Sequence, residues 1–382
     1  MAELMCKDET TGAPLINLVF EGGGVKGVGL VGALAVLEER GYRVRHVAGA
    51  SAGAIVAVLL AAGYSASELL TIAQTTGFKD LRDRDWVDRI PLLGGPISIF
   101  KDHGIYEGDR LVNWMRGLLA ERGIKTFGDL ETQTADARPV FRHVAQVIVS
   151  DLTERSLLVL PRDAHKLGID PSNLDVALAV RMSVSIPIFF EPVRFTNPRT
   201  GRQHVLVDGG LLSNFPVWLF DDEEEAGCPT LGIRLDEEDE EGRSRTNDLA
   251  LDSVLGFVKG LAQTAVSAHD RHYLERANFD RTIGVPSLGV GTTDFDISPE
   301  VSRALYESGR LAADAFLDQW CGHPMPVIQS AAADKEMSSS VSRIRPDGHC
   351  RDADADYSDW RVRVRVTATI ACSPPDRRRS VS

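Results

Sequence analysis

The stretch Val47-Ala48-Gly49-Ala50-Ser51-Ala52-Gly53 decides how the rest of the chain is interpreted. Its serine has a glycine two residues before it and another two residues after it, and the apolar run Ala54–Ala62 follows. This G-x-S-x-G spacing is typical of a tight turn from a strand into a helix, in which larger side chains at Gly49 and Gly53 would clash. Such a turn holds the serine hydroxyl partly exposed at the end of a strand, beside the free N–H groups of a helix N-terminus. A buried turn rich in Gly and Ala, with no chemical role, accounts equally well for the same five residues.

The residues before this turn repeat the alternation of strand and helix. The mostly apolar Leu15–Phe20 predicts a buried strand, and a glycine-rich loop leads from it into a helix over Val28–Arg40, closed by Gly41. His46–Ala50 predicts the next strand, which enters the serine turn. Strands that alternate with helices favour an α/β fold with a parallel sheet covered on both faces.

The glycine loop itself, Gly22-Gly23-Gly24-Val25-Lys26-Gly27, fits the G-x-G-x-x-G fingerprint of dinucleotide-binding proteins. That interpretation needs an acidic residue at the end of the following strand to bind a ribose, and here that strand ends in Gly49-Ala50-Ser51. If the loop lies beside Ser51, its N–H groups can instead stabilise an oxyanion. One such donor is worth about 3–4 kcal/mol of activation free energy.

Further elements follow along the chain. We expect paired strands at 140–150 and 157–160, a helix at 174–183, a strand at 204–207, and long helices at 249–277 and 301–320. The segment 80–106 is irregular and rich in apolar residues, which suits either a lid or a plug of the core. From residue 321 the composition shifts to Ala, Ser and Arg clusters without an apolar stripe, so we expect one domain at 15–320 and a disordered tail at 321–382.

The composition limits the possible partners and compartments. The 382 residues are 43% hydrophobic and 25% charged, as in soluble globular proteins, and the net charge of −13 argues against nucleic acid as a partner. The five cysteines are scattered, which predicts free thiols in a reducing compartment. The first 14 residues lack the apolar core of a signal peptide, and no apolar run is long enough to cross a bilayer. We therefore expect a cytoplasmic protein, with export without a cleaved signal left open.

A serine nucleophile needs a base, and that base is usually a histidine. His204 begins a strand, while His269 and His272 lie in a long amphipathic segment, so we interpret all three as packing or surface residues. Asp208 ends the apolar strand at 204–207 and precedes Gly209-Gly210, which predicts a carboxylate at the carboxyl edge of the sheet. Burial would raise its pKa from about 3.9 toward a useful value. Asp-Gly-Gly is also an ordinary turn after a strand.

Taken together, the glycine loop, the serine turn and Asp208-Gly209-Gly210 resemble the signature of patatin-like phospholipases in order, spacing and strand context. The resemblance covers roughly Leu15–Gln319 and leaves the tail unexplained. It implies a three-layer α/β/α sandwich around a mostly parallel sheet, and a lipid acyl hydrolase with a Ser–Asp dyad. Family members commonly have arginine at the position of Lys26, so Lys26 is assigned no role.

Carried over by position, Ser51 is the expected nucleophile and Asp208 the expected base. The expected oxyanion hole consists of the backbone N–H groups of Gly22, Gly23, Gly24 and Val25, and the other motif glycines are Gly27, Gly49, Gly53, Gly209 and Gly210. The resemblance implies neither a metal nor a cofactor. It implies a phospholipid or other lipid ester as substrate and transient contact with a membrane surface, and it leaves open whether a protein activator is needed.

Two other functions stay open at this point. A catalytically silent or acyltransferase-type lipid-binding protein could have the same fold, and the intact Ser51 and Asp208 argue against the silent form. A nucleotide-binding Rossmann enzyme is the less favoured alternative, because the ribose-binding acid is missing.

Overall fold

The computed structural model describes residues 6–8, 10–76, 104–106, 108–132, 142–221, 228–236, 280–292, 294 and 297–320. The possible lid at 80–103, the helix expected at 249–277, His269 and His272 within it, and the tail from 321 lie outside these residues.

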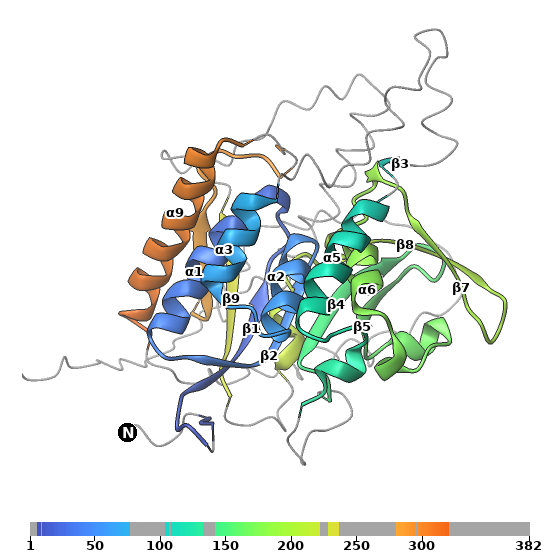
Figure 1. Cartoon of the computed structure of the whole chain (residues 1–382), viewed down its shortest axis with the longest axis horizontal. Helices are drawn as coiled ribbons and strands as arrows, with labels where there is room; N and C mark the ends of the chain where they lie inside the picture. The colour runs from blue at the N-terminus through green and yellow to red at the C-terminus, as the bar shows by residue number, and fades with distance from the viewer. Residues whose placement is uncertain are drawn as a thin grey trace, which may run out of the picture. The chain divides into compact units, whose positions relative to one another are not determined.

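A mixed sheet forms the centre of the fold, with its strands in the order β10-β9-β1-β2-β4-β8-β7 and β5 paired with β4 (Figure 1). Its strands are β1 (Leu15–Phe20), β2 (Arg43–Ala50), β4 (Ala145–Asp151), β5 (Ser156–Leu160), β7 (Val193–Thr196), β8 (Gln203–Asp208), β9 (Thr230–Asp236) and β10 (Thr282–Pro286). The pairings from β10 through β4 are parallel, whereas β5, β8 and β7 pair antiparallel. Two short strands, β3 (Gly104–Tyr106) and β6 (Ile188–Phe190), form a separate parallel pair.

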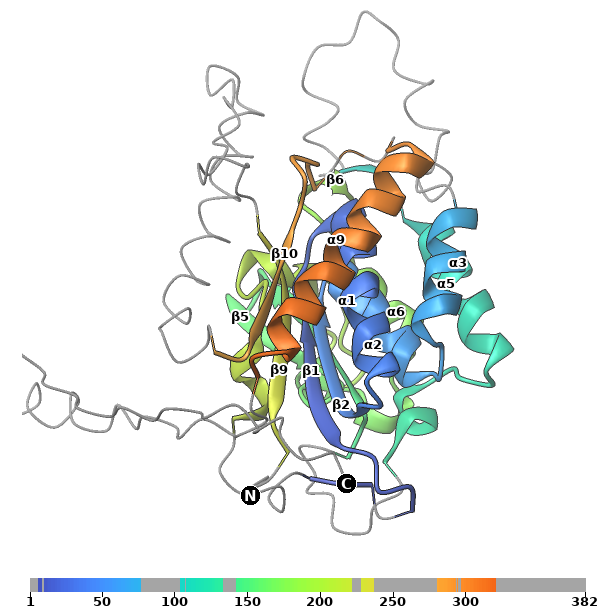
Figure 2. The ribbon, with the colours of Figure 1, turned by 90° about the vertical axis from the view of Figure 1, so that its left-hand side faces the viewer.

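The helices of the described part of the chain lie on one side of this sheet (Figure 2). They are α1 (Gly27–Glu39), α2 (Ala52–Ala61), α3 (Ala66–Thr75), α5 (Asp109–Glu121), α6 (Val176–Ser183) and α9 (Pro299–Leu317). The predicted α/β fold is therefore confirmed: a sheet with parallel strands at its centre is flanked by helices.

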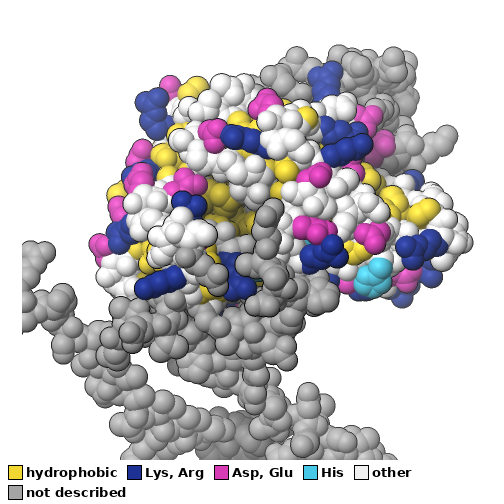
Figure 3. Space-filling model, turned by 60° about the horizontal axis from the view of Figure 1, so that its bottom comes forward, with side chains coloured by type: hydrophobic (Ala, Val, Ile, Leu, Met, Phe, Trp, Pro, Cys, Tyr) yellow, Lys and Arg dark blue, Asp and Glu magenta, His cyan; other side chains and the backbone are white. Residues whose placement is uncertain are grey.

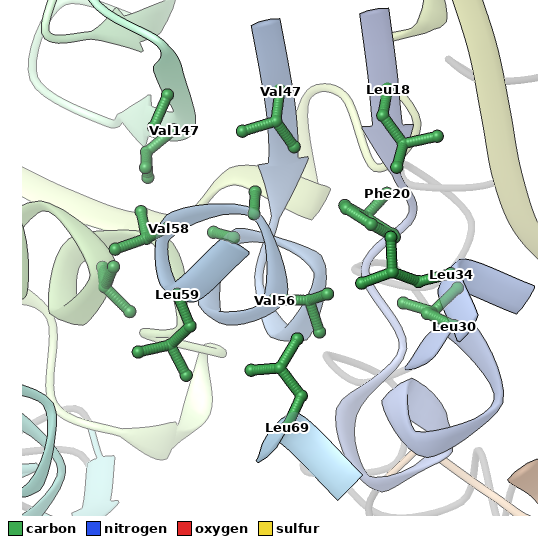
Figure 4. Packing of buried hydrophobic residues seen from close by; sticks show 14 of the residues in the cluster. Leu18, Phe20, Leu30, Leu34, Val47, Val56, Val58, Leu59, Leu69 and Val147 are labelled. Atoms are coloured by element: carbon green, nitrogen blue, oxygen red, sulfur yellow. The ribbon is translucent and has the colours of Figure 1, made fainter. Parts of the chain in front are cut away.

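The main core lies between the sheet and these helices (Figure 4). The sheet contributes side chains from three neighbouring strands: Leu18 and Phe20 (β1), Val47 (β2) and Val147 (β4). The helices contribute Leu30 and Leu34 (α1), Val56, Val58 and Leu59 (α2), and Leu69 (α3). A smaller cluster on the opposite face packs Val19, Ala48 and Ile148 against the 3-10 turn Val217–Phe220. Burial on both faces explains why β1 and the second half of β2, Val47–Ala50, are almost continuously apolar in sequence.

Helices α1 and α9 cross closely because glycines line the contact. A Cβ atom on Gly309 would lie 1.9 Å from the carbonyl oxygen of Gly29, and one on Gly32 would lie 2.0 Å from that of Tyr306. Ser298 caps the N-terminus of α9, because its side chain accepts a hydrogen bond from the N–H of Val301. Thr292, in the loop between β10 and α9, lies against the glycine-rich loop, and its carbonyl accepts a hydrogen bond from the N–H of Val25 at 3.4 Å.

Cys6 and Cys228 form a disulfide, so the prediction of free thiols is wrong for this pair. The two residues are 222 positions apart in sequence, but β1 and β9 are parallel neighbours, with Asn17 opposite Thr230. Cys6 precedes β1 and Cys228 precedes β9, so the sheet topology brings their side chains together. Local sequence spacing carries no information on such a pairing.

Figure 3 shows the face that lies at the bottom of Figure 1. Hydrophobic side chains gather in the middle of this face, and basic and acidic side chains are interspersed around them. Neither sign of charge dominates the visible part of the face. Within the described ranges, no helix has the length and hydropathy needed to cross a bilayer.

Candidate active site

Ser51 occupies the turn between β2 and α2 in an unusual backbone conformation, with φ at 51° and ψ at −124°. Steric crowding explains the glycine on either side. A Cβ atom on Gly49 would lie 2.3 Å from the carbonyl of Gly53, and one on Gly53 would lie 2.5 Å from the carbonyl oxygen of Phe20. The sequence G-x-S-x-G therefore forms a sharp strand-to-helix elbow with the serine at its apex.

The Ser51 side chain is more buried than expected, with 6% of the residue exposed instead of a partly open hydroxyl. The glycine loop packs on it, because a Cβ atom on Gly22 would lie 3.1 Å from the Ser51 Cβ and 2.2 Å from Oδ1 of Asn214. The strands explain this proximity: Phe20, at the end of β1, lies opposite Gly49 of β2. The glycine loop and the elbow thus leave neighbouring strands side by side, as the sequence predicts.

Asp208 ends β8, as the sequence predicts, but it reaches Ser51 from the antiparallel part of the sheet, a strand direction that the sequence analysis does not specify. On one side of β4, Ala50 lies opposite Ile148, and on the other side Asp208 lies opposite Val149. Strand β4 extends beyond the end of β2, so β8 can run in the opposite direction and still end level with Ser51.

The Asp208 carboxyl is buried, with 5% of the residue exposed, and burial raises its pKa to about 7. The Ser51 hydroxyl and the N–H of Gly210 oppose this rise in pKa. The N–H of Gly210 donates to Oδ1 at 2.7 Å. Oδ2 is buried and has no hydrogen-bond partner among the described residues, so the contact with Ser51 is looser than a full hydrogen bond. Catalytic contacts are often long before substrate binds.

Two of the four expected oxyanion donors already donate hydrogen bonds within the protein. The N–H of Gly22 donates to the carbonyl of Asn214 at 3.1 Å, and that of Val25 donates to the carbonyl of Thr292 at 3.4 Å. No hydrogen bond to a described residue involves the N–H groups of Gly23 and Gly24. Gly24 has a φ of 57°, which favours glycine.

The remaining motif glycines differ in how strictly they are required. A Cβ atom on Gly209 would lie 2.2 Å from the carbonyl oxygen of Ile148, and one on Gly210 would lie 3.0 Å from Oδ1 of Asp208. A Cβ atom on Gly27 would make only an ordinary contact of 3.4 Å with Ala52. Close packing therefore explains Gly209 and Gly210 but gives no steric reason for Gly27.

Asn214 is a site residue that the sequence analysis missed. Its side-chain Nδ2 donates to the carbonyl of Gly22 at 3.0 Å and to Oε1 of Glu21 at 3.3 Å, while its own carbonyl accepts the Gly22 N–H. Asn214 thus joins the loop after Asp208 to the glycine loop. Its position six residues after Asp208 is the one signal that could have drawn attention to it.

His204 is not part of this arrangement. It lies four positions before Asp208 on β8 and is buried, with its Nδ1 2.7 Å from Oδ2 of Asp151. Asp151 also accepts hydrogen bonds from the N–H groups of Thr153 and Glu154. The interpretation of His204 as a packing residue therefore agrees with its surroundings. Within the described ranges, no group of three His, Cys, Asp or Glu side chains could hold a metal ion.

The fold and the site together define an α/β protein with a serine elbow, a glycine loop beside it and a buried aspartate opposite. The family model for the patatin-like phospholipases matches residues 18–221, a span that contains all three features. A Bacillus subtilis (strain 168) protein, the uncharacterised YqhO, is 38% identical over 80% of this chain and 99% of its own length. This chain belongs to the patatin-like phospholipase family.

Two further comparisons give more distant similarities. A protein of Invertebrate iridescent virus 6 described as probable lipid hydrolase 463L is 27% identical, over 53% of this chain and 61% of its own. The crystal structure of VipD from Legionella pneumophila superposes with a TM-score of 0.50 at 21% identity, covering 83% of this chain and 70% of that chain. The likeness to VipD concerns the fold alone.

Proposed function

We propose that this protein is a lipid acyl hydrolase of the phospholipase A or lysophospholipase type, with Ser51 as nucleophile and Asp208 as base. The observation that carries the proposal is the buried Asp208 carboxyl, whose pKa is raised to about 7 and which lies beside a serine at a strained elbow. A general base works best when its pKa lies near the operating pH. Patatin-like family membership and the lipid hydrolase relative support a lipid ester as substrate.

The reaction has an acylation step and a deacylation step. In acylation, Oγ of Ser51 attacks the ester carbonyl carbon, and its proton passes to Oδ2 of Asp208. Collapse of the tetrahedral intermediate breaks the bond to the leaving alcohol, which takes the proton back from Asp208. In deacylation, a water molecule gives a proton to Asp208 and attacks the acyl carbon. Ser51 then leaves with that proton, and the fatty acid is released.

Burial suits Asp208 to both parts of this cycle. The Asp208 carboxylate accepts the Ser51 proton. The neutral carboxyl that results is the protonation state that burial favours. The Gly210 N–H holds Oδ1, so Oδ2 is the oxygen left to exchange the proton. No histidine is required in this scheme.

The negative charge on the carbonyl oxygen needs donors close to Ser51. In this proposal the N–H groups of Gly23 and Gly24 are the main donors to the oxyanion, because those of Gly22 and Val25 already donate to protein carbonyls. The first N–H groups of α2, which begins at Ala52, add the positive end of the helix dipole. Each well-placed donor is worth about 3–4 kcal/mol of activation free energy.

The cellular setting is part of the proposal. We propose transient contact with membrane surfaces that carry the substrate, in the cytoplasm if Cys6 and Cys228 are reduced in the cell, and after export if they are bonded. Disulfides are rare in the reducing cytosol, so the Cys6–Cys228 disulfide argues for an oxidising compartment. The redox state of this pair in protein isolated under thiol-blocking conditions decides between the two locations.

The direct test is hydrolysis of phosphatidylcholine vesicles by the purified full-length chain in water enriched in ¹⁸O. The wild type is expected to release fatty acid that carries ¹⁸O, and Ser51→Ala is expected to release none while melting at nearly the same temperature. Release of fatty acid by Ser51→Ala at more than a small fraction of the wild-type rate would remove Ser51 as nucleophile.

The same assay separates the alternatives. An acyltransferase-type protein would move the acyl group to an added alcohol in preference to water, and a catalytically silent protein would bind vesicles without releasing fatty acid. The dinucleotide alternative has no support in the patatin-like family match, and a thermal shift on addition of NAD would be needed to revive it.

A further inference from the structure

The end of α6 contacts both members of the dyad through their backbone N–H groups. The N–H of Ser51 donates to Oγ of Ser183 at 3.0 Å, and the N–H of Asp208 donates to the carbonyl of Ser185 at 2.9 Å. Ser51 and Asp208 come from different strands, β2 and β8, which do not pair with each other. The three-residue segment 183–185 therefore connects two residues that the sheet alone would leave on separate strands.

The Ser183 hydroxyl is fully committed to this connection. Ser183 is completely buried, and its Oγ donates to the carbonyl of Ile148 on β4 at 2.7 Å. Its single proton is used in that bond, so its lone pair is what accepts the Ser51 N–H. Ile148 in turn lies opposite Ala50, the residue before Ser51. One hydroxyl thus joins α6, β4 and the elbow.

The elbow needs such support because Ser51 has a positive φ of 51°, a backbone conformation that residues other than glycine rarely adopt. Strained backbone of this kind persists only where the surroundings hold it in place. The orientation of the peptide before Ser51 also sets the direction of its Cα–Cβ bond, and therefore the position of Oγ relative to Oδ2 of Asp208.

We propose that Ser183 is a positioning residue, which fixes the Ser51 peptide so that the Ser51 hydroxyl faces Asp208. The inference rests on the function proposed above and adds a residue that lies outside its chemical steps. Loss of the Ser183 hydroxyl leaves the Ser51 N–H without its acceptor and lets the elbow peptide rotate. A misplacement of about 1 Å at a reacting atom lowers the rate by about 10²-fold.

Two neighbouring serines define the choice of variants. The Ser185 hydroxyl contacts the buried Arg181, so its removal would disturb Arg181 as well. Ser213 is the matched control: it is 1% exposed, lies near Asp208 in sequence, and its Oγ has no hydrogen-bond partner among the described residues. Ser213→Ala removes a buried hydroxyl from the same region without removing a hydrogen bond.

The experiment measures acylation of the full-length chain by a fluorophosphonate probe, with the maximal rate (kinact) and half-saturating concentration (KI) determined separately. We compare wild type, Ser183→Ala, Ser183→Cys, Ser183→Thr and Ser213→Ala below their melting temperatures. The Ala and Cys variants lack a strong acceptor, and Thr retains the hydroxyl. Cys also preserves the side-chain volume, so it serves if the Ala variant fails to fold.

The expected result is a loss of about 10²-fold in kinact for Ser183→Ala and Ser183→Cys with KI unchanged. The Thr variant should exceed Ala at least tenfold, and Ser213→Ala should match wild type. The pH midpoint of kinact should shift upward in the Ala and Cys variants, because the Ser51 hydroxyl, which lowers the pKa of Asp208, no longer faces it. A folded Ala or Cys variant within threefold of the wild-type kinact would overturn the proposal. A wild type that the probe does not label at Ser51 would contradict the proposed function, and the role of Ser183 would fall with it.

Discussion

The N–H of Gly210 donates a 2.7 Å hydrogen bond to Oδ1 of Asp208, within a turn that begins at the aspartate itself. This contact fixes the carboxylate plane and occupies one oxygen, while Oδ2 is buried and accepts no hydrogen bond from a described residue. A glycine is required at this position because a Cβ atom there would lie 3.0 Å from Oδ1 and 2.7 Å from Oδ1 of Asn214. The sequence Asp-Gly-Gly thus orients the carboxylate and keeps one oxygen available.

The pH dependence of acylation should report the ionisation of Asp208. Only the carboxylate accepts the Ser51 proton, and burial raises the pKa of this group to about 7. We expect kinact for the fluorophosphonate to rise tenfold per pH unit at low pH and to level off above about pH 7. The measurement is kinact from pH 5 to pH 9 in a buffer of constant ionic strength. A profile that is flat over this range, or half-maximal near pH 4, would contradict the assignment.

The same carboxyl should make the protein less stable as the pH rises. The folded-state pKa of Asp208 is raised, so the native state binds a proton between about pH 4 and 7 that the unfolded state has released. The free energy of unfolding therefore falls across that window, by at most about 4 kcal/mol, and does not recover above it. Asp208→Asn removes the charge and should be more stable than wild type at pH 8, with the difference vanishing near pH 4. Urea unfolding at both pH values measures this; a variant less stable than wild type at pH 8 would contradict it.

The close approach of Thr292 to the glycine loop gives a test of loop geometry. A Cβ atom on Gly24 would lie 1.9 Å from the Thr292 carbonyl oxygen, so Gly24→Ala must displace the loop. Gly41→Ala is the matched control, since Gly41 also has a positive φ, 82°, but a Cβ atom added there would meet no described atom within 4 Å. Both variants should lose about 1 kcal/mol from backbone strain. Gly24→Ala alone should lose about 10²-fold or more in lipid hydrolysis. Equal activities of the two variants would remove the glycine loop from the site.

The disulfide predicts a redox-dependent stability. Cys6→Ser should lower the free energy of unfolding by about 2–5 kcal/mol, because the bond closes a long loop in the unfolded chain. Calorimetry in the presence and absence of dithiothreitol measures this effect, and peptide mapping without reduction identifies the bonded pair. With excess reductant, wild type and Cys6→Ser should melt together. A wild type whose melting is insensitive to reductant would show that the pair is not bonded or does not stabilise the fold.

Local patterns in the sequence predicted the elements that carry the site. Gly49 and Gly53 identify the elbow because backbone crowding tolerates no side chain there, and the apolar runs before the glycine loop and the elbow identify two adjacent strands. The position of Asp208 at the end of its strand was also predicted correctly.

The features that depend on long-range pairing could not be predicted in the same way. The antiparallel direction of β8 follows from its pairing with β4, more than 50 residues earlier, and no local pattern records it. Ser183 and Asn214 act through a few hydrogen bonds to groups that are distant in sequence, and such bonds leave no periodicity or spacing in the sequence. The disulfide joins residues 222 positions apart for the same reason.

The central claim is that Asp208 is the base and that no histidine takes part. The measurement is kinact for fluorophosphonate labelling of Ser51 in Asp208→Asn, His204→Gln, His269→Gln and His272→Gln, each confirmed as folded by its melting transition. Asp208→Asn should lower kinact by 10²–10⁴-fold or more, the range for loss of a general base, and each histidine variant should stay within about threefold of wild type. His204 provides the strictest comparison, because it lies on the same strand and is buried against Asp151. A histidine variant that loses as much as Asp208→Asn would contradict the dyad.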